Sequence, residues 1–318
     1  MTLNVVHVDG YRKFCNKLWN ATRFALMKLG EHFVPSTDAA LTGHESLAER
    51  WILHRLNVAA RNVSAALTDM NFMAATTAVH SFWLHELCDV YIEYIKPITT
   101  PDADAAARHS AQQTLSTCLD QGLKLLHPFM PFVTEELWQR LPRRASETSP
   151  SISVSAYPEP RSDYENSQAE SEFELIMSIT KAGRSLTADY NVLSKSTFFI
   201  SNANNASHAL VSAQFDGIVT LIKGCQSATS LAPEESVPAG CALVSVSDEV
   251  VIHLLVRGQV DINQEIGKIE KKTKVPNYET NVPEEVRNTN ASKIGDYKAE
   301  INVLQKAIET FLTLKGSS

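Results

Sequence analysis

Apolar residues recur at spacings of three and four through the first 145 residues, which is the period of an α-helix with one buried side. Residues 9–29 follow this period and carry polar side chains on the opposite side. A second stripe follows Ser46-Leu47-Ala48-Glu49, which fits a capping box, since the serine and the glutamate can satisfy free amides at a helix start. Further boundaries are predicted at Asn71 and Pro97 for a third helix, at Thr100 and Pro128 for a fourth, and at Thr134 for a fifth. The sequence therefore predicts a mostly α-helical fold with a helical bundle over residues 1–145.

The pattern changes after residue 145. Residues 145–161 carry Ser, Thr and Pro around one strand-like stretch, Ile152–Val154, and we interpret them as a domain boundary. Beyond them, helical patterns alternate with strand patterns at residues 197–201, 241–247 and 250–257. Residues 146–260 are therefore predicted to form a small mixed α/β junction domain.

The last segment, residues 261–318, is again helical in pattern. Its apolar residues form a heptad-like seam after a proline-containing turn at residues 274–283, and the seam is Ile294, Tyr297, Ile301, Leu304, Ile308 and Phe311. We predict an antiparallel helical hairpin, a coiled coil, whose first arm is shorter than its second. This mismatch leaves open whether the hairpin reaches another molecule.

Charge is distributed unevenly along the chain. The net charge is −7, but residues 1–144 carry 14 basic and 14 acidic side chains, and residues 261–318 carry nine of each. The acidic excess lies in residues 145–260, so both ends can form local basic faces that attract phosphates. The five cysteines form no Cys-x-x-Cys pair, which argues against a disulfide framework and a zinc site and favours the cytoplasm. The basic first thirty residues also fit a mitochondrial presequence, which we consider the less favoured interpretation.

Several ordered segments are similar to one enzyme family. Residues 15–24 read Cys-Asn-Lys-Leu-Trp-Asn-Ala-Thr-Arg-Phe, and residues 126–138 read Leu-His-Pro-Phe-Met-Pro-Phe-Val-Thr-Glu-Glu-Leu-Trp. Both resemble the anticodon-binding domain of class I aminoacyl-tRNA synthetases, and most closely that of valyl-tRNA synthetases. Residues 154–160 resemble the linker of that family, residues 188–191 the segment after its anticodon domain, and residues 258–261 the entry to its C-terminal coiled coil.

The resemblance implies a function in protein synthesis. It implies that the chain binds valine-specific tRNA and supports ATP-dependent charging of that tRNA with valine. The sequence contains no His-x-Gly-His stretch, no Lys-Met-Ser-Lys-Ser loop and no glycine-rich phosphate loop, so we expect no cofactor and no catalytic residue in this chain, with ATP bound elsewhere in the parent enzyme. The chain is then a fragment, a truncated form or a stand-alone descendant. A catalytic domain in cis, or other translation proteins held by the hairpin, are the other partners considered, and no membrane span is expected.

Candidate tRNA-binding residues follow from the resemblance and from side-chain chemistry. Trp51 lies off the apolar stripe of the second helix beside basic residues, where an indole can stack on a base and a guanidinium can bind a phosphate. Without the resemblance, this face would be interpreted as a solvated surface. With it, the predicted tRNA-binding residues are Asn16, Lys17, Asn20, Arg23, Arg50, Trp51, Arg55, Phe132, Glu136, Lys268, Lys271 and Lys272.

Two other classes of protein stay open. A protein-interaction or scaffold module derived from a synthetase would reuse the bundle without binding RNA, and the acidic middle domain favours it. The equivalent region of a leucyl or isoleucyl enzyme shares the helix motifs. A metal site at His80, His85, Cys88 and Asp89 is disfavoured, because the helix that carries them is mostly apolar and no second ligand cluster exists.

Overall fold

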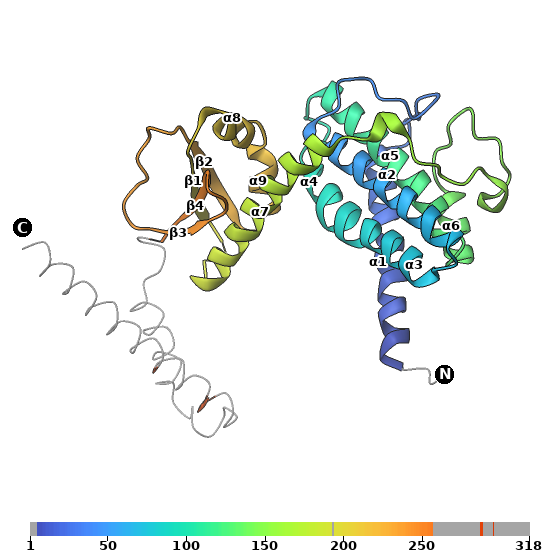
Figure 1. Ribbon diagram of the computed structural model, residues 1–318, viewed down its shortest axis with the longest axis horizontal. Helices are drawn as coiled ribbons and strands as arrows, with labels where there is room; N and C mark the ends of the chain where they lie inside the picture. The colour runs from blue at the N-terminus through green and yellow to red at the C-terminus, as the bar shows by residue number, and fades with distance from the viewer. Residues whose placement is uncertain (1–4, 193, 257–286, 289–294, 296–318) are drawn as a thin grey trace, which may run out of the picture.

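The computed structural model describes residues 5–192, 194–256, 287–288 and 295. Within these ranges the chain forms a helical bundle and a smaller α/β part, and one long helix, α7, runs from the first to the second (Figure 1). The predicted hairpin and its lysines Lys268, Lys271 and Lys272 lie outside the described residues. Among the described helices, none combines the length and the apolar character needed to cross a membrane.

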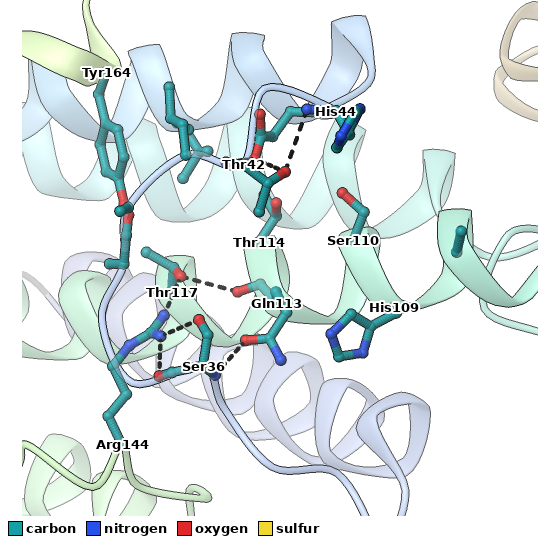
Figure 2. Close-up of a pocket in the computed structure, with 16 residues that line it drawn as sticks. Ser36, Thr42, His44, His109, Ser110, Gln113, Thr114, Thr117, Arg144 and Tyr164 are labelled. Carbon is teal, nitrogen blue, oxygen red and sulfur yellow. Dashed lines mark hydrogen bonds between the residues drawn. The ribbon is translucent and has the colours of Figure 1, made fainter.

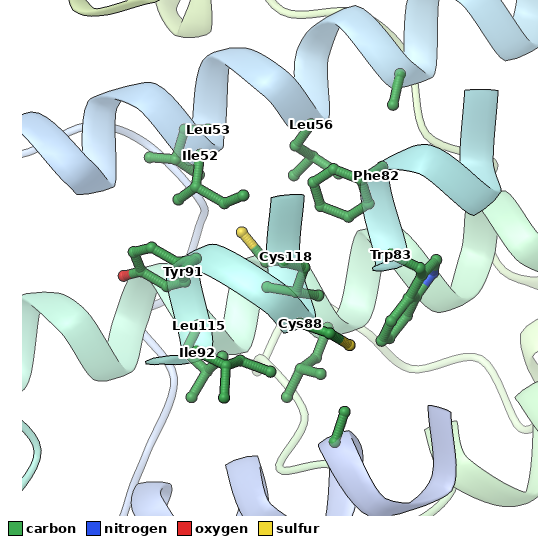
Figure 3. Close-up of a cluster of buried hydrophobic side chains, with 14 of the residues drawn as sticks. Ile52, Leu53, Leu56, Phe82, Trp83, Cys88, Tyr91, Ile92, Leu115 and Cys118 are labelled. Atoms are coloured by element: carbon green, nitrogen blue, oxygen red, sulfur yellow. The ribbon is translucent and has the colours of Figure 1, made fainter. Parts of the chain in front are cut away.

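The bundle is built from α1 to α6. Its elements are α1 (Val5–Leu29), α2 (Leu47–Thr68), α3 (Phe72–Ser81), the π-helix η1 (Phe82–Tyr91), α4 (Ile92–Tyr94), α5 (Ala105–Leu126) and α6 (Pro131–Trp138). Buried side chains of α2, η1, α4 and α5 meet in the centre, where Trp83, Tyr91 and Leu115 are fully buried (Figure 3). Trp83 Nε1 donates a hydrogen bond to the Gly122 carbonyl at 2.9 Å, which satisfies its only polar atom.

Local signals placed some helix starts correctly and others wrongly. The capping box at Ser46 and the Asn71 cap of α3 are confirmed. The predicted fourth start at Thr100 is wrong, because residues 97–103 form turns and the Asp104 carboxylate accepts from the Ala107 amide instead. The predicted fifth start at Thr134 is also wrong, because Pro131 occupies the first turn and the Thr134 hydroxyl donates back to the Met130 carbonyl.

The π-helix η1 is a feature that the sequence analysis did not predict. It continues directly from α3 over ten residues, although most π-helices are single turns inserted in α-helices. The carboxylate of Glu86 in η1 accepts a hydrogen bond from Arg55 of α2, whereas Asp89 pairs with Lys17 of α1. Two residues three apart on an α-helix would lie on one side. The π winding lets η1 reach two different helices with them.

The connection to the α/β part contains two short 3₁₀ turns, η2 (Ile152–Val154) and η3 (Ser162–Tyr164), followed by α7 (Ser167–Asp189). The strand predicted at Ile152–Val154 is therefore wrong. The carboxylate of Glu135 accepts hydrogen bonds from the Ile152 amide and the Ser151 hydroxyl. The Ile152 amide is therefore bonded to a side chain and not to a neighbouring strand.

The α/β part is a four-stranded mixed sheet with three helices on one face. Its elements are β1 (Ser196–Asn202), α8 (Asn205–Ala213), α9 (Phe215–Leu221), β2 (Cys225–Leu231), β3 (Cys241–Ser245) and β4 (Val250–Leu255), and the strand order is β2-β1-β4-β3. Strands β1 and β2 are parallel, while β4 pairs antiparallel with β1 and β3. Phe198 and Ile252 on one face pack against α7, α8 and α9. The prediction of a mixed α/β fold is confirmed, although strand β2 was not predicted.

Helix α7 contributes to both cores. Phe173 near its start lies in the bundle core, whereas Ile176 and Ile179 belong to the core under the sheet. A further contact closes the junction, since Tyr94 of α4 donates to Gln214 at 2.8 Å and lies edge-on to Phe173 at 5.8 Å between ring centroids. The two parts are therefore joined by packed side chains as well as by the chain.

Candidate nucleic-acid interface

The polar side of α2, predicted to bind RNA, contacts the chain itself. We call this contact the α2–α7 interface; it comprises His54, Arg55, Asn57 and Arg61 of α2 with Arg161, Glu165, Asn166 and Glu170 of the η3–α7 segment. His54 is buried; its Nδ1 accepts from the Asn166 amide at 3.0 Å and its Nε2 lies 3.2 Å from Glu170. These partners select the tautomer that carries hydrogen on Nε2. The polar groups of this face of α2 are therefore bonded within the chain.

The burial of Trp51 corrects the expectation that its indole lies open beside the basic residues of α2. The indole is only 6% exposed and stacks on Phe173 of α7, with ring centroids 4.3 Å apart and an interplanar angle of 23°. It lies off the stripe that faces the bundle because it belongs to a second contact, with a helix that begins more than a hundred residues later. Trp51 is therefore not available to stack on RNA.

The two arginines predicted beside Trp51 are also engaged within the chain. Arg55 pairs with Glu170 and with Glu86 at 2.7 Å. Burial would lower the pKa of Arg55, but its hydrogen bonds to these carboxylates outweigh burial and raise the pKa. Arg50 is half-buried and donates to the Glu45 carbonyl at 2.6 Å. Both guanidinium groups are therefore partly buried and bonded within the chain, and their contact with RNA stays a prediction.

The outer side of α1 is more open to another molecule than the polar side of α2. We call it the α1 surface, formed by Arg12, Asn16, Lys17, Asn20 and Arg23, all of them exposed. Asn16, Asn20 and Arg23 make no side-chain hydrogen bond or ion pair with any residue that the structure describes. Donors and acceptors on this surface are therefore available to another molecule. The sequence analysis predicted four of these five residues as tRNA-binding.

Aromatic rings border the α1 surface on both sides. On one side, the ammonium groups of Lys28 and Lys96 lie 5.5 and 5.6 Å from the centroid of the Phe24 ring. On the other, the guanidinium of Arg140 lies 5.4 Å from the ring of Trp19, which is 39% exposed. The sequence analysis assigned no role to Trp19, Phe24 or Arg140. Their positions depend on α4 and α6, which no local pattern in α1 reveals.

Helix α6 carries two further predicted residues, Phe132 and Glu136. Phe132, directly after Pro131, is 90% exposed. Glu136 accepts from Arg140 Nε at 3.0 Å, and thereby orients the guanidinium that covers Trp19. The structure therefore brings Glu136 to the edge of the α1 surface through Arg140, and leaves Phe132 exposed on the same helix.

A cavity of about 330 Å³ lies between the loop after α1 and helix α5 (Figure 2). Arg144 donates to the Ser36 carbonyl at 2.7 Å and to the Thr117 hydroxyl at 2.6 Å, and burial lowers its pKa. These bonds occupy the guanidinium and tie the loop to α5, so the cavity offers no free cation for a phosphate. Within the described part of the chain, no group of three or more His, Cys, Asp or Glu residues is placed to hold a metal ion.

Comparison with known proteins finds one family model that matches the middle of the chain, from α2 to β1. Residues 49–201 match the family of the anticodon-binding domain of tRNA ligase. The chain is 39% identical to the mitochondrial valine–tRNA ligase of Saccharomyces cerevisiae and 44% identical to the valine–tRNA ligase of Homo sapiens. These alignments cover 99% and 98% of this chain but 30% and 26% of the two proteins. The valine–tRNA ligase of Schizosaccharomyces pombe is 47% identical over 71% of the chain and 23% of its own length.

Residues 49–201 are thus similar to the anticodon-binding domains of tRNA ligases. Among these ligases the relatives are valine–tRNA ligases, and the resemblance extends over nearly the whole chain. The chain spans less than a third of the length of these relatives. It corresponds to a part of such an enzyme.

Replacing Trp51 tests its assignment to the core. Because the indole is buried against Phe173, we expect Trp51→Ala to lower the free energy of unfolding by about 3 to 5 kcal/mol. Trp19→Ala is the matched control, since its half-exposed ring should cost clearly less. Chemical denaturation of the two variants decides between the assignments, and equally small losses would show that Trp51 is not a core residue.

The α2–α7 interface predicts a dependence of stability on pH. Partial burial would raise the pKa of Glu170, but hydrogen bonds from Arg55 and His54 outweigh it and hold the pKa below the ordinary value of 4.5. A carboxyl whose pKa is depressed by folding stabilises the fold above its unfolded value and loses that contribution as pH falls through its folded value. We expect Glu170→Gln to cost about 1 kcal/mol at neutral pH and to approach the unsubstituted chain below pH 4.5.

The matched control is Glu174→Gln, one helical turn further along α7 and exposed. Its unfolding free energy should follow that of the unsubstituted chain from neutral to acid pH. A Glu170→Gln curve that runs parallel to the control throughout would contradict the proposed contribution of the interface.

Proposed function

We propose that this chain is the tRNA-binding region of a valine–tRNA ligase and supports ATP-dependent attachment of valine to its tRNA. The contrast between two helices carries the proposal. Polar side chains of α2 are bonded within the chain, whereas Asn16, Asn20 and Arg23 of α1 have no partner among the described residues. The family match of residues 49–201 and the valine–tRNA ligase relatives support the choice of tRNA as the ligand.

The composition of the α1 surface supports single-stranded RNA as the form that binds. Proteins recognise unpaired loop bases by stacking them on aromatic or guanidinium planes and by hydrogen bonding to their edges. The α1 surface offers asparagine amides between basic side chains, with Phe24 on one border and Trp19 under Arg140 on the other. Phe132 of α6 offers a further exposed ring. An anticodon loop presents the unpaired bases that such a surface can bind.

The reaction of the ligase belongs, in this proposal, to a part of the enzyme that these 318 residues do not carry. The chain has no stretch that would cradle the phosphates of ATP. The arrangement of domains 1–145, 146–260 and 261–318, with Lys268, Lys271 and Lys272 of the hairpin as further tRNA contacts, remains part of the proposal. Valine-dependent exchange of pyrophosphate into ATP by the purified chain would contradict it.

A cytoplasmic location is likewise proposed. The described cysteines are unpaired, which suits a reducing compartment. Relatives include ligases that are named mitochondrial and others that are not. Fluorescence microscopy of the chain fused to a fluorescent protein at its C-terminus would test this location. Fluorescence found only in mitochondria would overturn it.

Substitution of Arg23 tests the proposed tRNA site. If its guanidinium bonds a phosphate, Arg23→Gln should weaken binding of a valine tRNA transcript about 10- to 150-fold, since charge-assisted hydrogen bonds are worth about 1.5 to 3 kcal/mol. The slope of log affinity against log salt should also become shallower by about 0.7 to 0.9, the share of one phosphate. Binding titrations over a salt series measure both quantities.

Lys181→Gln provides the control, because Lys181 is an exposed cation of α7 away from the α1 surface. It removes the same charge from the chain and should change affinity little. Equal effects of the two substitutions would show that only total charge matters and would remove the α1 surface as the binding site.

A further inference from the structure

Asp89 of η1 stands at the border of the α1 surface. Its Oδ1 accepts from Lys17 Nζ at 3.0 Å, and both side chains are 46% exposed. Its Oδ2 lies 3.8 Å from His85 Nδ1. The hydrogen bond to Asp89 is the main cause that raises the pKa of Lys17. A cation and a carboxylate are thus presented side by side to solvent, next to the surface proposed to bind RNA.

The pair has little value for folding. Ion pairs with this exposure contribute little to the free energy of folding, and salt screens them. For RNA binding the carboxylate is unfavourable if Lys17 only neutralises a phosphate, because it repels the phosphate and competes for the ammonium. The placement of Asp89 is therefore better explained by a ligand group that donates a hydrogen bond.

The winding of η1 sets this placement. Glu86 and Asp89 are three residues apart, yet Glu86 pairs with Arg55 of α2 while Asp89 pairs with Lys17 of α1. Glu86 therefore binds a residue of the α2–α7 interface. Asp89, three residues further along the π-helix, lies instead at the α1 surface. π-helical segments frequently occur at functional sites, and here the segment supplies a carboxylate to one.

We propose that Lys17 and Asp89 together recognise the edge of one unpaired base that carries an exocyclic amino group. Asp89 accepts from the amino group, and Lys17 donates to the neighbouring ring nitrogen or carbonyl oxygen of the same base. Adenine, cytosine and guanine carry such an amine, whereas uracil does not. The inference rests on the proposed function, because it assigns a base-selecting role to a residue at the border of the same RNA site.

The experiment uses the full 318-residue chain and synthetic anticodon stem-loops of valine tRNA. In each stem-loop, one loop base loses only its amine: adenosine becomes purine riboside, guanosine becomes inosine, or cytidine becomes its 4-deamino analogue. For the unsubstituted chain, one of these changes should weaken binding about 5- to 150-fold, the value of a well-placed pair of base contacts. In Asp89→Ala the same change should weaken binding less than about twofold.

Asp9→Ala is the matched control. Asp9 is an exposed carboxylate that lies 2.8 Å from Lys13 and 3.8 Å from Arg12, so its removal also frees basic groups of α1. It should tighten binding of all stem-loops alike and keep the penalty for the lost amine. Thermal unfolding of both variants establishes that they are folded.

Two results separate the inference from the proposed function. If Asp89→Ala keeps the full penalty, or if Asp9→Ala loses it equally, the base-selecting role of Asp89 is overturned while tRNA binding stands. If the unsubstituted chain fails to prefer the valine stem-loop to an unrelated one, the proposed function is overturned, and this inference with it.

Discussion

The stacking of Trp51 on Phe173 is the contact on which the arrangement of this chain depends. It joins α2 of the bundle to the first turns of α7, and α7 then continues into the core under the sheet. Around the rings, buried His54 bonds the Asn166 amide that opens α7, and Glu170 binds both His54 and Arg55. Burial of the two rings stabilises the contact between α2 and α7. The polar bonds around the rings fix the direction in which α7 leaves the bundle.

That contact also determines where RNA can bind. A surface whose donors and acceptors are already satisfied within the chain would have to lose those bonds before it could bind a base, at a cost for each buried group left unpaired. The α2 face is such a surface. The α1 surface, with Asn16, Asn20 and Arg23 open and aromatic rings on both borders, requires no such loss. Asp89 lies at the border of this open surface, where its carboxylate pairs with Lys17 and stays half-exposed.

The sequence predicted what short-range physics controls. The capping box at Ser46, the Asn71 cap and the amphipathic α1 follow from residues within a few positions of one another, and the structure contains all three. Trp51 was misassigned because its partner Phe173 lies 122 positions away, and a helical period cannot show that a residue off one stripe packs in a second interface. Strand β2 was not predicted because its polar sequence Cys-Gln-Ser-Ala-Thr-Ser-Leu becomes a strand only by pairing with β1.

Hydroxyl-radical footprinting with and without valine tRNA tests the central claim, that RNA contacts α1 and that the polar side of α2 is an internal interface. In the free chain, Tyr11 of α1, Trp19 and Phe132 have exposed rings. The account predicts that tRNA protects at least one of these rings from oxidation. It also predicts that Trp51, buried by Phe173, oxidises slowly in the free chain and that tRNA leaves its rate unchanged. Rapid oxidation of Trp51 that tRNA suppresses, with no protection at Trp19 or Phe132, would contradict the account.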